Sequence, residues 1–207
     1  MRCCWLMWVV AGSLLLGCND NQPKRGARKG TETPSRSYVA DESSYAGPDE
    51  SFDPNDTNVR FGAIRLTAPE GWTRQPTQSS FTLAEFKLPR AKGDDKDGRL
   101  TVSVAGGSIQ ANIDRWKGQF SGALEKAEQK EIDANGIQIT LVDFSGEFSD
   151  QRGPFVSGDK QTGYRMIAAI IPVNDQLHFV KAVGPEKTME AHAEKIKTFI
   201  RSVKPDA

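Results

Sequence analysis

The stretch IQANIDRWKGQF, residues 109–120, decides how the rest of the chain is expected to fold. Its apolar residues recur at steps of four, three and four: Ile109, Ile113, Trp116 and Phe120. This spacing predicts an α-helix with one apolar face, which must be buried against the segments on either side. The polar residues Asn112, Arg115 and Gln119 form a separate row on the same helix.

Three strands are expected before this helix, over residues 61–67, 81–88 and 99–105. The third is the clearest, because Leu100, Val102 and Val104 alternate with polar residues and so share one face. A pair of glycines then ends the strand, and Ser108 is placed to cap the helix.

Four strands are expected after the helix, over residues 128–133, 137–148, 166–171 and 176–183. The dipeptide Asn135-Gly136 predicts a tight hairpin between the first two. The continuous apolar run at 166–171 is typical of a central strand covered on both faces. Residues 149–163 are expected to form a loop. A closing helix follows Pro185, with apolar positions at helical spacing: Met189, Ala193, Ile196, Phe199, Ile200 and Val203.

The order of three strands, helix, four strands and helix predicts an α+β fold. We expect a single, curved, mostly antiparallel sheet with helices packed on its faces. This domain is expected to span residues 59–204, a length that can bury an independent core.

The start of the chain predicts an export signal over residues 1–17. Arg2 supplies the positive charge, and the apolar run that follows is shorter than the ~20 residues of a membrane-spanning helix. The run ends in Leu15-Leu16-Gly17-Cys18, which resembles the lipobox of bacterial lipoproteins. The resemblance implies cleavage before Cys18 and attachment of acyl chains, such as palmitate, to that residue. The alternative is an ordinary secretory signal in which Cys18 is coincidental.

If Cys18 is lipidated, the protein is extracytoplasmic and anchored to a bacterial cell membrane, on the periplasmic side or the cell surface. Cys3 and Cys4 leave with the signal, so no thiol remains for a disulfide, a metal site or a nucleophile. Residues 18–58 are rich in Pro, Gly, Ser and charges, and predict a disordered tether between the lipid and the domain.

The turn Pro69-Glu70-Gly71-Trp72, the two helices and the hairpin resemble the PsbP-type α-β-α sandwich, which includes DcrB-type bacterial lipoproteins. Residues 112–119 also resemble an N-x-x-R-W-x-x-Q signature of uncharacterised exported proteins of planctomycete-like bacteria. These resemblances imply a fold and a location, and they imply binding more than catalysis.

Several kinds of chemistry are not indicated by the sequence. Lysine and arginine number 27, as do aspartate and glutamate, and this balance argues against nucleic-acid binding. His178 and His192 lack the spacing of a metal site, since His192 does not share a helix face with the glutamates beside it. No nucleophile elbow, phosphate loop or dinucleotide fingerprint is present, so we expect no cofactor.

The candidate binding residues are the helix residues Asn112, Arg115, Trp116 and Gln119, together with Arg165 and Lys181. Arg115 could bind a carboxylate or phosphate through two parallel hydrogen bonds. Alternatively, it could pair with Glu85 or Asp143 and serve the structure.

The sequence therefore predicts a membrane-anchored, non-catalytic binding or scaffolding module with an envelope protein as its partner. The alternative is a small-ligand receptor or an enzyme with a basic cleft formed by Arg115, Arg165 and Lys181.

Overall fold

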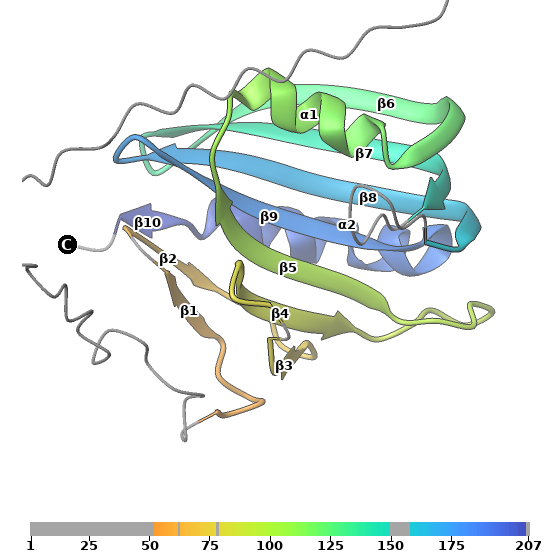
Figure 1. The fold of residues 1–207 in the computed structure, drawn as a ribbon. Helices are drawn as coiled ribbons and strands as arrows, with labels where there is room; N and C mark the ends of the chain where they lie inside the picture. The colour runs from red at the N-terminus through yellow and green to blue at the C-terminus, as the bar shows by residue number, and fades with distance from the viewer. Residues whose placement is uncertain (1–51, 62, 78, 150–157, 206–207) are drawn as a thin grey trace, which may run out of the picture. The chain divides into compact units, whose positions relative to one another are not determined.

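The computed structural model describes residues 52–61, 63–77, 79–149 and 158–205. Their main feature is a seven-stranded antiparallel sheet in the order β3-β4-β5-β9-β8-β7-β6 (Figure 1). In chain order the strands are β3 (Thr73–Gln75), β4 (Thr82–Leu88), β5 (Gly98–Ala105), β6 (Phe120–Ala134), β7 (Ile137–Ser149), β8 (Lys160–Val173) and β9 (Gln176–Pro185). The two helices are α1 (Ile109–Lys117) and α2 (Glu186–Arg201).

The helices lie on opposite faces of this sheet (Figure 1). Alternate residues of β8 show the division. Met166, Ala168 and Ile170 belong to the apolar core beneath α1, whereas Ile167, Ala169 and Ile171 belong to the core beneath α2. The predicted central strand with two buried faces is therefore confirmed, as is the predicted α+β class with a mostly antiparallel sheet.

The prediction of a single sheet was wrong. A second sheet has the order β1-β2-β10 and consists of β1 (Asn58–Phe61), β2 (Ile64–Thr67) and β10 (Lys204–Pro205). Residues 61–67 were expected to form one strand, but the chain reverses there and pairs Phe61 with Ile64. Ile64 and Leu66 then enter the core beneath α2, beside Phe199.

The strand β6 begins eight residues before its predicted start. Residues 122–127 lacked the apolar alternation of a half-buried strand, because β6 lies at the sheet edge and is mostly exposed. Likewise β8 begins at Lys160, inside the expected loop, and residues 150–157 of that loop lie outside the described residues.

The hairpin between β6 and β7 is confirmed. Asn135 and Gly136 have φ values of 54° and 79°, the left-handed pair that a two-residue hairpin turn requires. The Asn135 amide also donates to the carbonyl oxygen of Val203 at 2.7 Å. This bond joins the hairpin to the end of α2.

The predicted signal, Cys18 and most of the predicted tether lie outside the described residues. Within residues 52–58, Asp56 forms an ion pair with Arg74 of β3 at 2.7 Å. No helix in the described part of the chain is long and apolar enough to span a membrane.

Candidate binding site

The start of α1 is fixed by side chains that bond to the backbone. The Ser108 hydroxyl accepts from the amide of Ala111 at 3.1 Å and caps the helix as predicted. The buried Asn112 donates to the carbonyl oxygens of Ser108 and Gly106, at 2.9 and 3.2 Å. Asn112 therefore holds the turn that leads into α1, and it does not line the pocket described next.

The apolar face of α1 is anchored on the sheet by aromatic contacts. The rings of Trp116 and Phe179 meet edge to face, with centroids 5.6 Å apart at 82°. Phe120, just beyond the helix, meets Phe144 and Phe148 in the same way. This packing fixes the rotation of α1.

A small pocket of about 160 Å³ lies where α1 meets β5 and β9. Its lining comprises Thr101, Ser103, Arg115, Trp116, Gln119, Phe179 and Lys181. The Lys181 ammonium donates to the Gln119 side-chain oxygen at 3.1 Å, and Thr101 lies opposite Lys181 on the neighbouring strand. Four of the six predicted binding residues thus meet in one place, which we call the α1 pocket.

Arg115 is the exposed cation of the α1 pocket and has no ion pair within the described residues. The predicted structural alternative for it is wrong, because both expected partners are occupied. Glu85 accepts two bonds from Arg99, at 2.8 and 2.7 Å, and Asp143 accepts two from Arg165. The guanidinium of Arg115 is therefore available to a carboxylate, phosphate or sulfate group.

Arg165 does not join the α1 pocket, so the predicted cleft of Arg115, Arg165 and Lys181 is not formed. Lys181 lies opposite Ala168, which faces α1. Arg165 has the parity of Ile167, which faces α2, and neighbouring residues of a strand point to opposite sides.

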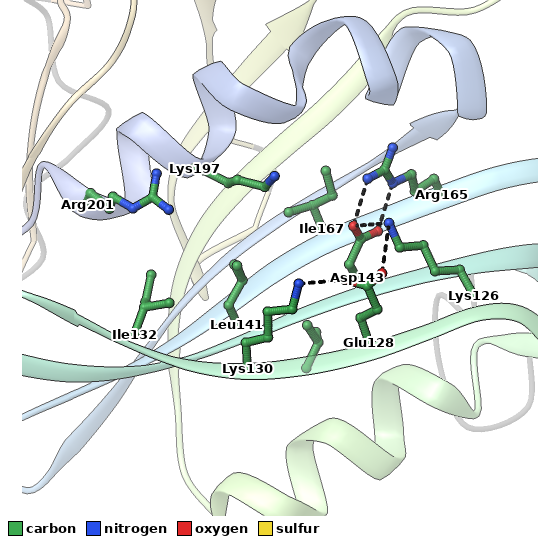
Figure 2. Close-up of a pocket in the computed structure, with 11 residues that line it drawn as sticks. Lys126, Glu128, Lys130, Ile132, Leu141, Asp143, Arg165, Ile167, Lys197 and Arg201 are labelled. Carbon is green, nitrogen blue, oxygen red and sulfur yellow. Dashed lines mark hydrogen bonds and ion pairs between the residues drawn. The ribbon is translucent and has the colours of Figure 1, made fainter.

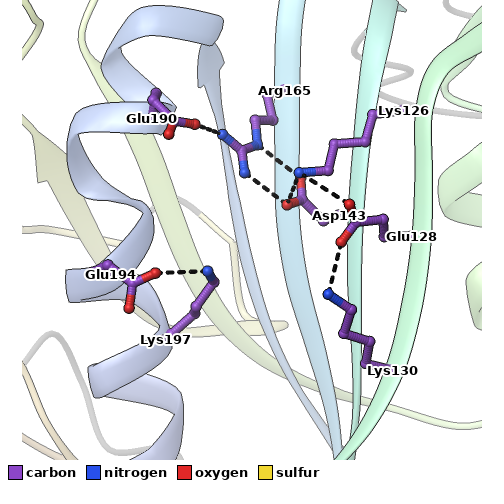
Figure 3. A network of polar contacts seen from close by, with 8 residues as sticks. All are labelled: Lys126, Glu128, Lys130, Asp143, Arg165, Glu190, Glu194 and Lys197. Carbon is purple, nitrogen blue, oxygen red and sulfur yellow. Dashed lines mark hydrogen bonds and ion pairs between the residues drawn. The ribbon is translucent and has the colours of Figure 1, made fainter.

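On the α2 face, Arg165 is the buried centre of a charged network (Figure 3). Its Nε and Nη2 donate to the two oxygens of Asp143, both at 2.7 Å, and Nη1 donates to Glu190 of α2. Lys126 adds a third cation beside Asp143, at 2.8 Å. The network therefore ties α2 to strands β6, β7 and β8.

The network also sets the charge states of its members. Burial by itself would raise the pKa of Asp143, but hydrogen bonds from Arg165 and Lys126 outweigh burial and lower it. The hydrogen bond to Asp143 raises the pKa of Lys126. Both groups are thus held in their charged forms.

Beside the network lies a groove of about 170 Å³ between α2 and strands β6 to β8 (Figure 2). Sequence reasoning missed both features. A signal for them was present in the alternation of Lys126, Glu128 and Lys130 along β6, and in Lys197 and Arg201 one helical turn apart on α2. Those patterns do not reveal that the strand and the helix face each other.

The two histidines have structural surroundings. Trp72 Nε1 donates to His192 Nδ1 at 3.1 Å, and the geometry then assigns the proton to Nε2, which donates to the carbonyl of Pro89 at 2.9 Å. His178 lies buried in β9, where burial lowers its pKa and favours the neutral ring. In the described part of the chain, no group of three or more His, Cys, Asp or Glu residues could hold a metal ion.

No protein-family model matches the chain, and no curated protein matches it. Among solved structures, a protein of unknown function, PA94 from Pseudomonas aeruginosa, is 17% identical over 73% of this chain and 97% of its own, with a TM-score of 0.44. PsbP (CyanoP) from Synechocystis sp. PCC 6803 is 14% identical over 77% of this chain and 100% of its own, also with a TM-score of 0.44. These are distant likenesses of fold, and nothing about function passes from them to this chain.

Proposed function

We propose that this protein is a lipid-anchored, extracytoplasmic binding module of bacterial envelopes, with a PsbP-like fold and no catalytic role. The observation that carries the binding role is the α1 pocket, where the exposed Arg115 lies beside Lys181 and Gln119. The lipobox-like sequence that ends at Cys18 supports the anchor. The N-x-x-R-W-x-x-Q resemblance to exported proteins of planctomycete-like bacteria supports the location.

A binding role fits the α1 pocket better than catalysis does. Acid–base chemistry near neutral pH needs a carboxylate, an imidazole or another group that can exchange a proton with the substrate. The described lining provides hydroxyl, amide, guanidinium, ammonium and aromatic groups, and no carboxylate, imidazole or thiol. Such groups hold an anion in place without moving a proton.

The anchor is tested by metabolic labelling with radioactive palmitate in the native host. We expect the wild-type chain to take up label and to fractionate with membranes, because acylated Cys18 would partition into the bilayer. A Cys18→Ala variant is expected to take up none. Label on the variant would overturn the proposed anchor.

The binding role is tested by affinity capture from gently solubilised membranes. We expect the wild-type protein to recover an envelope partner and an Arg115→Ala variant to lose it. Lys92→Ala is the matched control, because Lys92 is another exposed cation and does not line the pocket. Capture that is unchanged by Arg115→Ala would overturn the assignment of the α1 pocket. Turnover in a hydrolase screen, with no partner captured, would overturn the non-catalytic role.

A second candidate function, a receptor for a small anion, is favoured by the size and lining of the same pocket. About 160 Å³ is below the ~300 Å³ of typical ligand pockets, but it suits a short carboxylate or inorganic phosphate. Calorimetric titration with succinate and with phosphate separates the two functions. Saturable heat that disappears in Arg115→Ala would support the receptor, and no heat with either anion would overturn it.

A further inference from the structure

The groove between α2 and the sheet, which we call the α2 groove, combines an apolar floor with a basic rim (Figure 2). Ile132, Leu141 and Ile167 supply the floor. Lys130 extends from β6 on one side, and Lys197 and Arg201 extend from α2 on the other. The groove lies on the opposite face of the sheet from the α1 pocket, so the two sites are independent.

The cations around the α2 groove fall into two groups. Arg165 and Lys126 bind the nearly buried Asp143, at 2.7 and 2.8 Å, and these contacts hold them in place. A ligand at that end of the groove would meet charges that are already neutralised. These two cations therefore shape the groove and contribute little to binding an anion.

The cations at the other end are easier to recruit. Lys130 pairs with Glu128 at 3.0 Å, but the side chains are 65% and 47% exposed. Lys197 pairs at 2.7 Å with Glu194, whose side chain is 81% exposed. Such surface pairs contribute little stability and exchange readily for another anion. Arg201 has no ion pair within the described residues.

These exchangeable cations converge on the same part of the groove as the apolar floor. Lys130 lies directly opposite Leu141 on the neighbouring strand, and Ile132 follows two residues later on the same face. An anionic head group that contacts Lys130, Lys197 and Arg201 would thus place an attached apolar chain over Leu141 and Ile132.

We propose that the α2 groove binds a small amphiphilic carboxylate, with its head group on Lys130, Lys197 and Arg201 and its chain on the apolar floor. Charge complementarity selects the head group, and the planar guanidinium of Arg201 can hold both carboxylate oxygens. The volume of about 170 Å³ corresponds to roughly six water molecules at about 30 Å³ each, which limits the ligand to a short chain.

The test is equilibrium dialysis of radiolabelled octanoate against the full chain in phosphatidylcholine nanodiscs, with empty nanodiscs as the blank. We expect saturable binding that unlabelled octanoate displaces and that acetate and octanol displace poorly. Acetate lacks the apolar chain and octanol lacks the charge, so each probes one half of the site. Displacement by acetate or octanol as effective as that by octanoate would overturn the proposal, as would the absence of saturable binding.

Variants locate the bound ligand. Lys197→Gln combined with Arg201→Gln is expected to weaken octanoate binding by at least about tenfold, because two of the three head-group contacts are lost. Ile132→Thr keeps the β-branched shape and is expected to weaken binding through the floor. Unchanged affinity in the double variant would overturn the site.

Two controls separate this site from general charge effects. Lys187→Gln removes an exposed cation from the same helix outside the groove, and Arg115→Gln removes the cation of the α1 pocket. Both are expected to bind octanoate as the wild type does. Circular dichroism and thermal melting of each variant show whether the fold is intact, and Ile132→Thr supplies a second, uncharged test if the double variant does not fold.

Discussion

Arg165 and Asp143 form the buried ion pair that carries most of the electrostatic consequence at the residue scale. Replacing Asp143 with Asn would leave the Arg165 guanidinium buried beside a weaker partner. We therefore expect Asp143→Asn to lower the free energy of unfolding by about 3 kcal/mol, as measured by urea denaturation at pH 7.

Glu147→Gln is the control for that substitution, because its ion pair with Lys160 lies on the surface. We expect a change below about 1 kcal/mol there. Equal losses in the two variants would show that burial of Arg165 does not determine the cost.

The lowered pKa of Asp143 also predicts how stability depends on pH. Because its pKa is lower in the folded chain than the ordinary 3.8, the folded state favours the carboxylate. The resulting stabilisation is complete above the unfolded-state pKa and is lost as the pH falls through the folded-state pKa. Urea denaturation from pH 6 downward is therefore expected to show a loss of stability in the acid range that is smaller in Asp143→Asn. Identical pH profiles would contradict this cause.

The candidate site could be predicted from sequence to the extent that it is local. Arg115, Trp116 and Gln119 lie within one helix, so their spacing fixes their relative directions. Arg165 was misplaced because a strand residue changes face with each step along the chain. Its face follows from the parity of Ile167, but the sequence does not say which helix covers which face.

At the scale of elements, the contact between β5 and β9 depends on two glycines. A Cβ atom added to Gly184 would lie 2.8 Å from the Cα atom of Gly98, closer than such atoms approach in proteins. The two backbones would have to separate. We expect Gly184→Ala to destabilise the protein by about 1–3 kcal/mol in thermal or urea unfolding.

Gly106→Ala is the matched control, since a Cβ atom there meets nothing within 4 Å and the backbone φ is not positive. It is expected to be neutral or stabilising, because alanine reduces the freedom of the unfolded chain. If Gly184→Ala were equally well tolerated, the close approach would not be a constraint on the sheet.

Sequence reasoning succeeded for elements with strong periodicity or turn chemistry and failed for exposed or very short ones. The run at 166–171 and the turn at Asn135-Gly136 carry their own signals. Most of β6 is exposed, so its first part gave no apolar alternation to read. The hairpin of β1 and β2 was hidden because each strand has four residues, too few for a pattern.

At the scale of the whole molecule, residues 48–207 form one compact unit separate from residues 1–47. Its core contains residues from both sheets and from α2, and so closes without the preceding segment. A chain that begins at residue 48 is expected to unfold in one cooperative transition, with a free energy of unfolding within about 0.5 kcal/mol of the full chain. Calorimetry of both proteins measures this, and loss of the cooperative transition would show that residues 1–47 complete the fold.

The order of strands in the large sheet has a consequence for how densely this protein can be packed. An unpaired sheet edge is a template on which another chain can add a strand, which leads to aggregation or domain swapping. One edge here, β3, has three residues, and the other, β6, has lysine and glutamate along its length. Both edges thus resist the addition of a further strand. Many copies crowded into a thin layer could collide edge to edge and still remain separate folded domains.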